Sequence, residues 1–301
     1  MPLDIVGGSD FHQPFNPFPQ DSKLYFEVYE RPVYFKGGQG QMYPDNDYKA
    51  LIRVMPENNY PKRIGMVKKS YHVLHMEPLC KSIENNFLEC MDVEELSDVQ
   101  VVDQMSYYGG MMFRQYIFPH ISTDLGDGKS TIAFRTIVGN GYDGSTSFKL
   151  YNGSIDFFCT NGQVHGIYDM LIKRHTSSLT IPKLTKRIRD GIDIFYKQAD
   201  TYREWISKEI TDEDAKKVFE AIPNVSERRV EQLMRQYHIE AMSRGPNVWA
   251  LYSAATYYAS HNEGEFSVRN TNNDNQAATL MNRETQIRSW LNTEEFQLIA
   301  A

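Results

Sequence analysis

Alternating apolar and polar residues run through much of the first half of the chain. This period of two is typical of β-strands that bury one face. One helix interrupts the pattern after Pro78, because a mostly apolar set recurs at spacings of three and four: Leu79, Ile83, Asn86, Phe87 and Cys90. We therefore predict strands on both sides of this helix, within residues 23–35, 48–55, 63–74, 99–105, 111–118 and 130–138.

A dipeptide with a strong turn preference lies further along, at Asn152-Gly153. It stands between the β-prone runs FKLY and SIDFFC, and Asn-Gly in such a setting is a strong signal of a two-residue hairpin turn. We predict a hairpin that turns at these two residues. The second strand is expected to end at the polar sequence CTNG, and residues 163–173 are expected to continue as a helix.

The last third of the chain changes to helical spacing, which predicts helices within residues 181–210, 212–221, 226–244 and 278–291. A polar, asparagine-rich loop over 262–277 precedes the last of them. The predicted fold class is α+β, with a mostly antiparallel sheet, a packed helix and a helical C-terminal portion. We divide the chain into an extended arm (1–22), a core domain (23–180) and a helical region (181–301).

The composition narrows the classes of function. The chain has 301 residues, 41% of them apolar, and a net charge of −7, unlike a strongly basic nucleic-acid-binding domain. Three cysteines without CxxC spacing argue against a disulfide framework or a four-cysteine zinc site. His72 and His75 would point to opposite faces of a strand, so we expect neither metal nor cofactor. With no signal peptide and no apolar segment of spanning length, we expect a cytoplasmic protein that does not enter the membrane.

Basic residues nevertheless cluster in two islands that contain no acidic residue, at 61–74 and 173–189. Such islands suit phosphate contacts, although acids elsewhere in the fold would neutralise them. Tyr71 and Tyr142 are candidates for stacking on the bases of a single strand. The candidate phosphate contacts are Lys62, Arg63, Lys68 and Lys69 in the first island, and Lys173, Arg174, Lys183, Lys186, Arg187 and Arg189 in the second.

A catalytic alternative centres on the stretch that follows Gly139. Ser145 lacks the GxSxG pattern of a nucleophile turn, and Cys159 could pair with His165 or His175 as thiolate and base. A structural role for these groups is the simpler interpretation. The catalytic hypothesis is an enzyme or enzyme inhibitor with a pocket near Asp143, Ser145, Cys159, Asn161 and His175.

Three sequence features follow one another along the chain. The first is GMVKKSY at 65–71, and the second is Asp143-Gly144-Ser145 with a later strand ending in Cys159, Asn161 and Gly162, followed by His175. The third is Asn247-Val248-Trp249, which leads into an alanine-rich segment with Tyr257 and His261. In this order, the three features resemble those of the phage and plasmid proteins grouped as the DUF932 family.

The resemblance implies a phage- or plasmid-type protein, and the order of its elements is similar to the core of Rad52 and the phage annealases. Annealing needs no nucleophile, metal or nucleotide, only a basic groove that presents the bases of a strand. Our leading hypothesis is therefore a non-catalytic protein that binds and anneals single-stranded DNA as a homo-oligomer. The alternatives are the enzyme or inhibitor above and a structural or host-interaction protein without nucleic acid.

Overall fold

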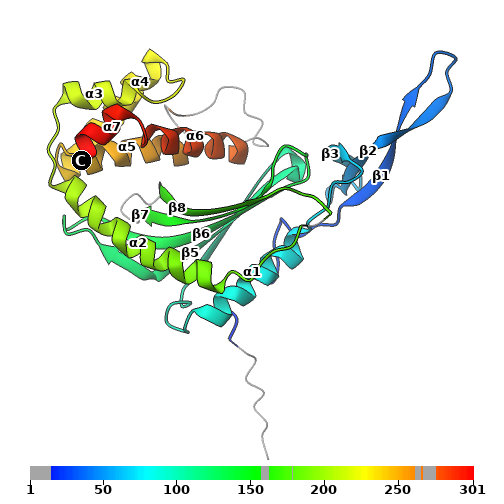
Figure 1. Ribbon diagram of the computed structural model, residues 1–301, viewed down its shortest axis with the longest axis horizontal. Coiled ribbons are helices and arrows are strands. Elements are labelled where there is room, and N and C mark those ends of the chain that lie inside the picture. The colour runs from blue at the N-terminus through cyan, green and yellow to red at the C-terminus, as the bar shows by residue number, and fades with distance from the viewer. Residues whose placement is uncertain (1–14, 157–162, 178, 262–265, 267–275) are drawn as a thin grey trace, which may run out of the picture.

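Two antiparallel sheets form the framework of the protein, as the α+β prediction requires (Figure 1). The computed structural model describes residues 15–156, 163–177, 179–261, 266 and 276–301. The smaller sheet contains β1 (Tyr29–Lys36), β2 (Met42–Val54) and β3 (Pro61–Lys68), and it projects from one end of the molecule.

The larger sheet forms the centre of the molecule. Its strands lie in chain order, so each pairs with the next along the sequence. They are β4 (Gln100–Ser106), β5 (Met111–Asp124), β6 (Thr131–Gly141), β7 (Phe148–Asp156) and β8 (Gln163–Lys173), with the short 3-10 helix η1 (Tyr107–Gly109) between the first two.

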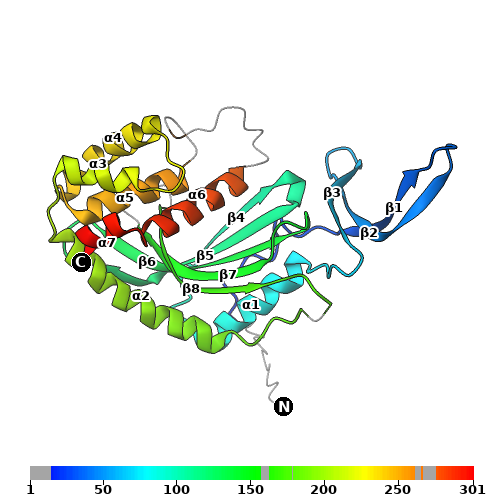
Figure 2. The same ribbon diagram turned by 45° about the horizontal axis from the view of Figure 1, so that its top comes forward.

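Helices cover both faces of the larger sheet (Figures 1 and 2). Arg114 on β5 contacts Glu84 of α1 (Met76–Cys90), whereas Arg135 on β6 contacts Glu284 of α6 (Gln276–Trp290). Arg135 pairs across the ladder with Ile117, three residues from Arg114 on β5, and residues an odd number apart point to opposite faces. Thus α1 lies on one face of the sheet and α6 on the other.

The C-terminal region is helical, as predicted. α2 (Thr185–Ile206) packs beside α1, and the helix α5 (Val248–Ser260) is buried among α2, α4, α6 and β8. The remaining helices are α3 (Asp212–Glu220), α4 (Glu227–Arg244) and α7 (Glu294–Ala300). None of the helices in the described part of the chain is both long and apolar enough to cross a membrane.

The predicted hairpin turn at Asn152-Gly153 is wrong. Both residues lie inside β7, and residues 163–173, predicted as a helix, form the strand β8. Asn152 is fully buried, where its side chain accepts a hydrogen bond from the Thr136 hydroxyl at 2.9 Å and donates to the backbone carbonyl of Arg187. The β7–β8 register shifts at this point, so the dipeptide marks a bulge within a buried strand. Turn propensity was overridden by tertiary packing.

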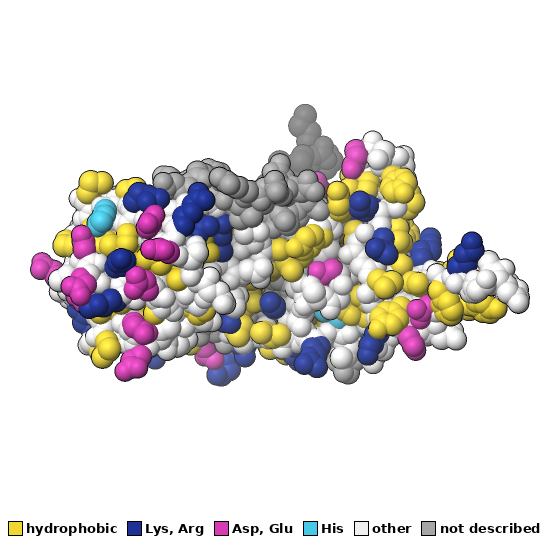
Figure 3. All heavy atoms as spheres, turned by 90° about the horizontal axis from the view of Figure 1, so that it is seen from above, with side chains coloured by type: hydrophobic (Ala, Val, Ile, Leu, Met, Phe, Trp, Pro, Cys, Tyr) yellow, Lys and Arg dark blue, Asp and Glu magenta, His cyan; other side chains and the backbone are white. Residues whose placement is uncertain are grey.

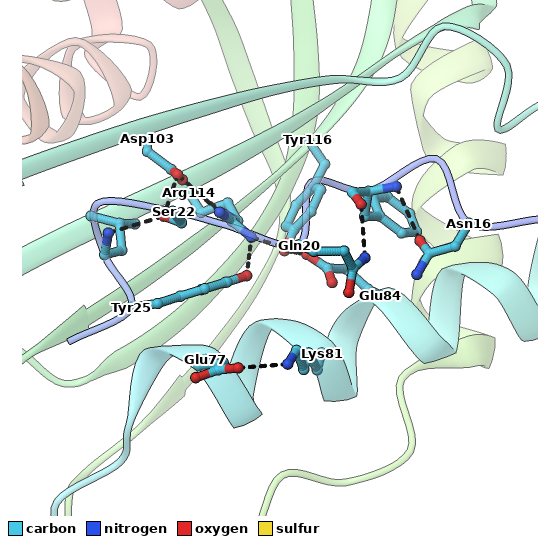
Figure 4. Close-up of polar contacts among 12 residues, drawn as sticks. Asn16, Gln20, Ser22, Tyr25, Glu77, Lys81, Glu84, Asp103, Arg114 and Tyr116 are labelled. Carbon is cyan, nitrogen blue, oxygen red and sulfur yellow. Dashed lines mark hydrogen bonds and ion pairs between the residues drawn. The ribbon is translucent and has the colours of Figure 1, made fainter. Parts of the chain in front are cut away.

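A buried ionic network ties the segment before β1 to the core (Figure 4). The fully buried guanidinium of Arg114 donates to both carboxylate oxygens of Asp103 at 2.8 and 2.9 Å, to Glu84 at 3.1 Å and to the Tyr25 hydroxyl. Ser22 donates to the same Asp103 at 2.5 Å. Because a buried charge is tolerated only when it is paired, this network holds residues 22–25 in place.

The proposed arm over residues 1–22 is described only from residue 15 onward. Within that part, the ring of Phe18 is buried against Phe87 and Tyr116, at centroid distances of 5.8 and 5.7 Å. The described end of the arm therefore packs on the core.

Candidate functional site

The outer face of the smaller sheet combines cations with exposed aromatic side chains. Residues that face each other across a ladder point to the same side of a sheet. Tyr48 faces Lys68, and Ile52 faces both Arg63 and Tyr29. These alternate positions are solvent-exposed, apart from the half-buried Ala50 and Ile52. We define the outer face as Tyr29, Arg31, Tyr48, Arg63, Met66 and Lys68.

The inner face of the same sheet packs on the body of the protein. Leu51 and Val67 are buried, and Gly65 lies so close to the larger sheet that a Cβ atom there would be 1.8 Å from the Tyr142 carbonyl oxygen. A side chain at residue 65 would push the sheets apart. This contact decides which alternate residues of β2 and β3 face solvent.

The cations of the first island have no acidic partner within the described residues. No ion pair involves Arg63, Lys68 or Lys69. Lys62 is half-buried on the other side of the sheet, with its Nζ 4.1 Å from the centre of the Tyr108 ring. The positive charge of Arg63 and Lys68 therefore remains available on the outer face.

Acids pair with three of the six basic residues of the second island. Lys183 pairs with Glu89 of α1, and Lys186 pairs with Asp190 at 3.0 Å. Arg189 donates two hydrogen bonds, of 2.6 and 2.9 Å, to Glu95. The side chain of Arg187 is half-buried on the same helix. This region therefore presents a mixture of charges and lacks a continuous basic surface.

The molecular surface differs between the two ends (Figure 3). Toward the projecting sheet, many yellow apolar side chains lie beside dark blue basic ones and a few magenta acidic ones. Over the helical end, dark blue and magenta side chains are interspersed.

The two candidate stacking tyrosines differ in their access to solvent. Tyr142 is fully buried, and its hydroxyl accepts a hydrogen bond from the Met76 amide at 3.2 Å, so its ring offers no surface to a base. Its proposal as a stacking residue is therefore wrong. Tyr71 is half-buried and donates to the Gly141 carbonyl at 2.6 Å.

A pocket lies at the junction of the two sheets and has a volume of about 460 Å³. It brings together Lys68 of the first island, Arg174 of the second, and Asp143 and His175 of the second sequence feature. Tyr48 and Met66 line it as well, so it continues the outer face. We call it the junction pocket.

His175 forms part of the wall of the junction pocket. Its ring stacks on Tyr71 with centroids 4.6 Å apart, and its Nδ1 lies 3.1 Å from the His72 carbonyl oxygen. A carbonyl oxygen only accepts, so Nδ1 carries the proton and Nε2 carries a lone pair. Burial lowers the pKa of His175 and favours this neutral form. Nε2 is buried without a hydrogen-bond partner among the described residues.

Among the described residues of the catalytic hypothesis, Ser145 is paired with Asp143 and not with a histidine base. Ser145 donates its hydroxyl to Asp143 at 2.6 Å, and the same carboxylate accepts the amides of Ser145 and Thr146 in a turn. The structure does not describe residues 157–162. Cys159, Asn161 and the predicted strand end at CTNG therefore lie outside the described residues. His165 contributes backbone to β8.

The third sequence feature has a structural role. Asn247 accepts the Ala250 amide at 2.8 Å and so begins α5, and the Trp249 indole donates to Ser130 at 3.0 Å. Next to them, Arg244 and Asp156 form a fully buried ion pair of 2.7 Å. These contacts fix the helical region to the larger sheet.

A family model described as a domain of unknown function, DUF932, matches residues 65–284, well over half of the chain. The chain belongs to the DUF932 family. No curated protein and no solved structure matches it. In this DUF932 protein, the matched region begins at Gly65, the glycine that allows the two sheets to meet.

Sequence reasoning missed four residues of the outer face: Tyr29, Arg31, Tyr48 and Met66. The signal was present in the alternation of β1 and β2, where residues 29 and 31, and 48 and 50, fall on the same side. The alternation alone does not tell which set of alternate residues faces solvent, because both sets in these strands include polar and aromatic side chains. The packing of the inner face decides this.

Proposed function

We propose that this DUF932 protein binds single-stranded DNA on the outer face of its smaller sheet. The observation that carries the proposal is the combination of exposed aromatic rings with cations that have no acidic partner among the described residues. Such a surface suits a single strand, because bases stack on aromatic rings and phosphates contact lysine and arginine. It suits a duplex less well, because the faces of paired bases are covered by their neighbours.

The strand would run across β1–β3 with its bases toward Tyr29 and Tyr48 and its phosphates toward Arg31, Arg63 and Lys68. Annealing of complementary strands and assembly into a homo-oligomer are further parts of the proposal. Both follow from the resemblance and from a binding mode that needs no catalytic group. The likeness to annealase cores stays a prediction.

Fluorescence anisotropy of labelled oligothymidylate tests the binding step. We expect the logarithm of the association constant to fall with the logarithm of salt concentration with a slope of roughly −2, as for about three neutralised phosphates. A duplex of the same length should bind more weakly. Absence of binding at about 50 mM salt, where phosphate contacts are strong, would exclude the proposal.

A separate assay tests annealing. Two complementary labelled strands should form duplex faster with the protein than without it, and light scattering of the purified protein should give a mass above that of one chain. Binding without faster annealing would restrict the function to strand binding.

A further inference from the structure

The junction pocket has the features of a second, distinct subsite at the end of the outer face. It lies where β3 ends and where β8 leads into Arg174 and His175, and it shares Tyr48, Met66 and Lys68 with the outer face. A strand lying on the outer face would therefore reach it without leaving the surface.

The pocket carries an excess of positive charge. Lys68 and Arg174 line it from opposite sheets, and neither forms an ion pair within the described residues. Its one carboxylate, Asp143, is engaged by three donors of its own turn. The hydroxyl groups of Ser70 and Ser147 add donors. Two cations with neighbouring hydroxyls form a suitable environment for a phosphate monoester.

His175, which forms part of the pocket wall, also carries an unsatisfied acceptor just beneath the surface. His175 is only 7% exposed, and its Nε2 lone pair has no partner among the described residues. A buried polar atom without a partner is unfavourable, and a ligand donor that reaches it would relieve that cost. A ligand that joins a phosphate to N–H or O–H donors meets both requirements, and a nucleotide is such a molecule.

The wall that holds His175 is rigid. The connection between β3 and α1 is fixed to the larger sheet by reciprocal bonds, in which the His72 amide donates to the His175 carbonyl at 3.2 Å and His175 Nδ1 donates to the His72 carbonyl. Asn140 adds a hydrogen bond of 2.6 Å to the Leu74 carbonyl. A pocket built on fixed walls loses little entropy when a ligand binds.

We infer that the junction pocket binds one nucleotide that carries a terminal phosphate, with Lys68 and Arg174 on the phosphate and His175 Nε2 accepting from the sugar or base. The inference deepens the proposed function, since the terminal nucleotide of a bound strand would occupy the pocket. A free nucleoside monophosphate presents the same chemistry.

Two sets of probes separate these sources. The first set is oligothymidylate with a 5′-phosphate, with a 3′-phosphate, or with hydroxyl groups at both ends. The second set is thymidine monophosphate, thymidine and inorganic phosphate, measured by calorimetry. We expect either the 5′- or the 3′-phosphorylated strand to bind about tenfold more tightly than the unphosphorylated strand. A factor of about ten is the contribution expected from one charge-assisted contact. Thymidine monophosphate should bind, and thymidine and phosphate alone should bind more weakly.

Arg174→Ala should remove the preference for the phosphorylated strand and the binding of thymidine monophosphate, while leaving the affinity for the unphosphorylated strand within about twofold. Lys173→Ala is the matched control. It also removes one positive charge, and Lys173 is the neighbour of Arg174 in the chain but does not line the pocket. Arg63→Ala should weaken all strands equally and preserve the preference.

Equal affinity for all three strands together with no binding of thymidine monophosphate would overturn the inference and leave strand binding intact. Phosphate binding as tightly as thymidine monophosphate would also overturn it, because the sugar and base would then contribute nothing. Binding of thymidine monophosphate without binding of any strand would support the pocket and exclude the proposed function.

Discussion

The two basic islands contain the same kinds of side chain but differ in their electrostatic surroundings. In the first, Arg63 and Lys68 project from a sheet face without a carboxylate in ion-pair contact. In the second, Lys183, Lys186 and Arg189 each contact an acid, two of which come from residues about ninety positions earlier in the chain. A run of basic residues therefore predicts a binding surface only when the fold brings no acids to it.

The largest expected effect comes from the first island. The double variant Arg63→Ala/Lys68→Ala should weaken binding of single-stranded DNA roughly fiftyfold at about 50 mM salt. Each lost phosphate contact removes the favourable free energy of releasing one counterion from the DNA. The salt dependence should become shallower by roughly 1.4 units of slope. Anisotropy titrations at several salt concentrations measure both quantities.

The matched control is Lys186→Ala/Arg189→Ala on α2. It removes two charges that already have acidic partners, so the affinity should change less than about threefold. If both double variants weaken binding equally, the distinction between the islands is wrong.

A smaller loss is expected from the aromatic part of the outer face. Tyr48→Ala should weaken binding about tenfold, because stacking of one base on an aromatic ring contributes about 1–3 kcal/mol. The salt dependence should not change, since no phosphate contact is lost. Tyr196→Ala, at a tyrosine of similar exposure on α2, is the control and should bind as the natural protein does. A change in salt slope for Tyr48→Ala would indicate a different binding mode.

The ion pairs of the second island predict that removing one of its cations slightly lowers the stability of the folded protein. Arg189→Ala should lower the free energy of unfolding by about 0.5 kcal/mol, since its partner Glu95 and the guanidinium are both partly exposed. Arg63→Ala should leave stability unchanged because it breaks no ion pair. Urea unfolding of the two variants measures the difference, and a larger loss for Arg63→Ala would contradict it.

The smallest effect concerns His175, where the two islands meet. Burial lowers its pKa below the ordinary value of 6.5, so the unfolded chain binds a proton more readily than the folded one. The stabilisation is fully present above the unfolded pKa and is lost as pH falls through the folded pKa. Urea unfolding between pH 7.5 and 5 should show this decline, and His175→Asn should reduce it. An unchanged slope in the variant would mean that other groups cause the decline.

Local patterns predicted several elements correctly. The spacing of Leu79, Ile83 and Phe87 predicted α1, and all three side chains are buried as expected. The alternation around Phe134 and Val138 predicted β6, which is buried along most of its length. The α1 prediction succeeds because burial of one face imposes its period on the residues of a single element. β6 is buried on both faces, so the alternation located the strand but did not show that both faces are covered.

Other expectations failed where distant contacts outweigh local preference. Asn152-Gly153 has a strong turn preference, yet Thr136 and the backbone of α2 satisfy the Asn152 side chain inside a buried strand. In the same way, sequence could not show that Tyr142 would be enclosed by the start of α1 and by Phe26, which precedes the smaller sheet. No local pattern contains these partners.

The sequence by itself determined the class of fold, the positions of most helices and the family of the chain, because each depends on periods and motifs within short segments. Only the tertiary structure decided which cations keep their charge and which residues share the junction pocket. Ion pairing and pocket formation depend on the distance between segments far apart in the chain, such as Lys183 and Glu89 or Lys68 and Arg174. That distance is a property of the packed sheets and helices.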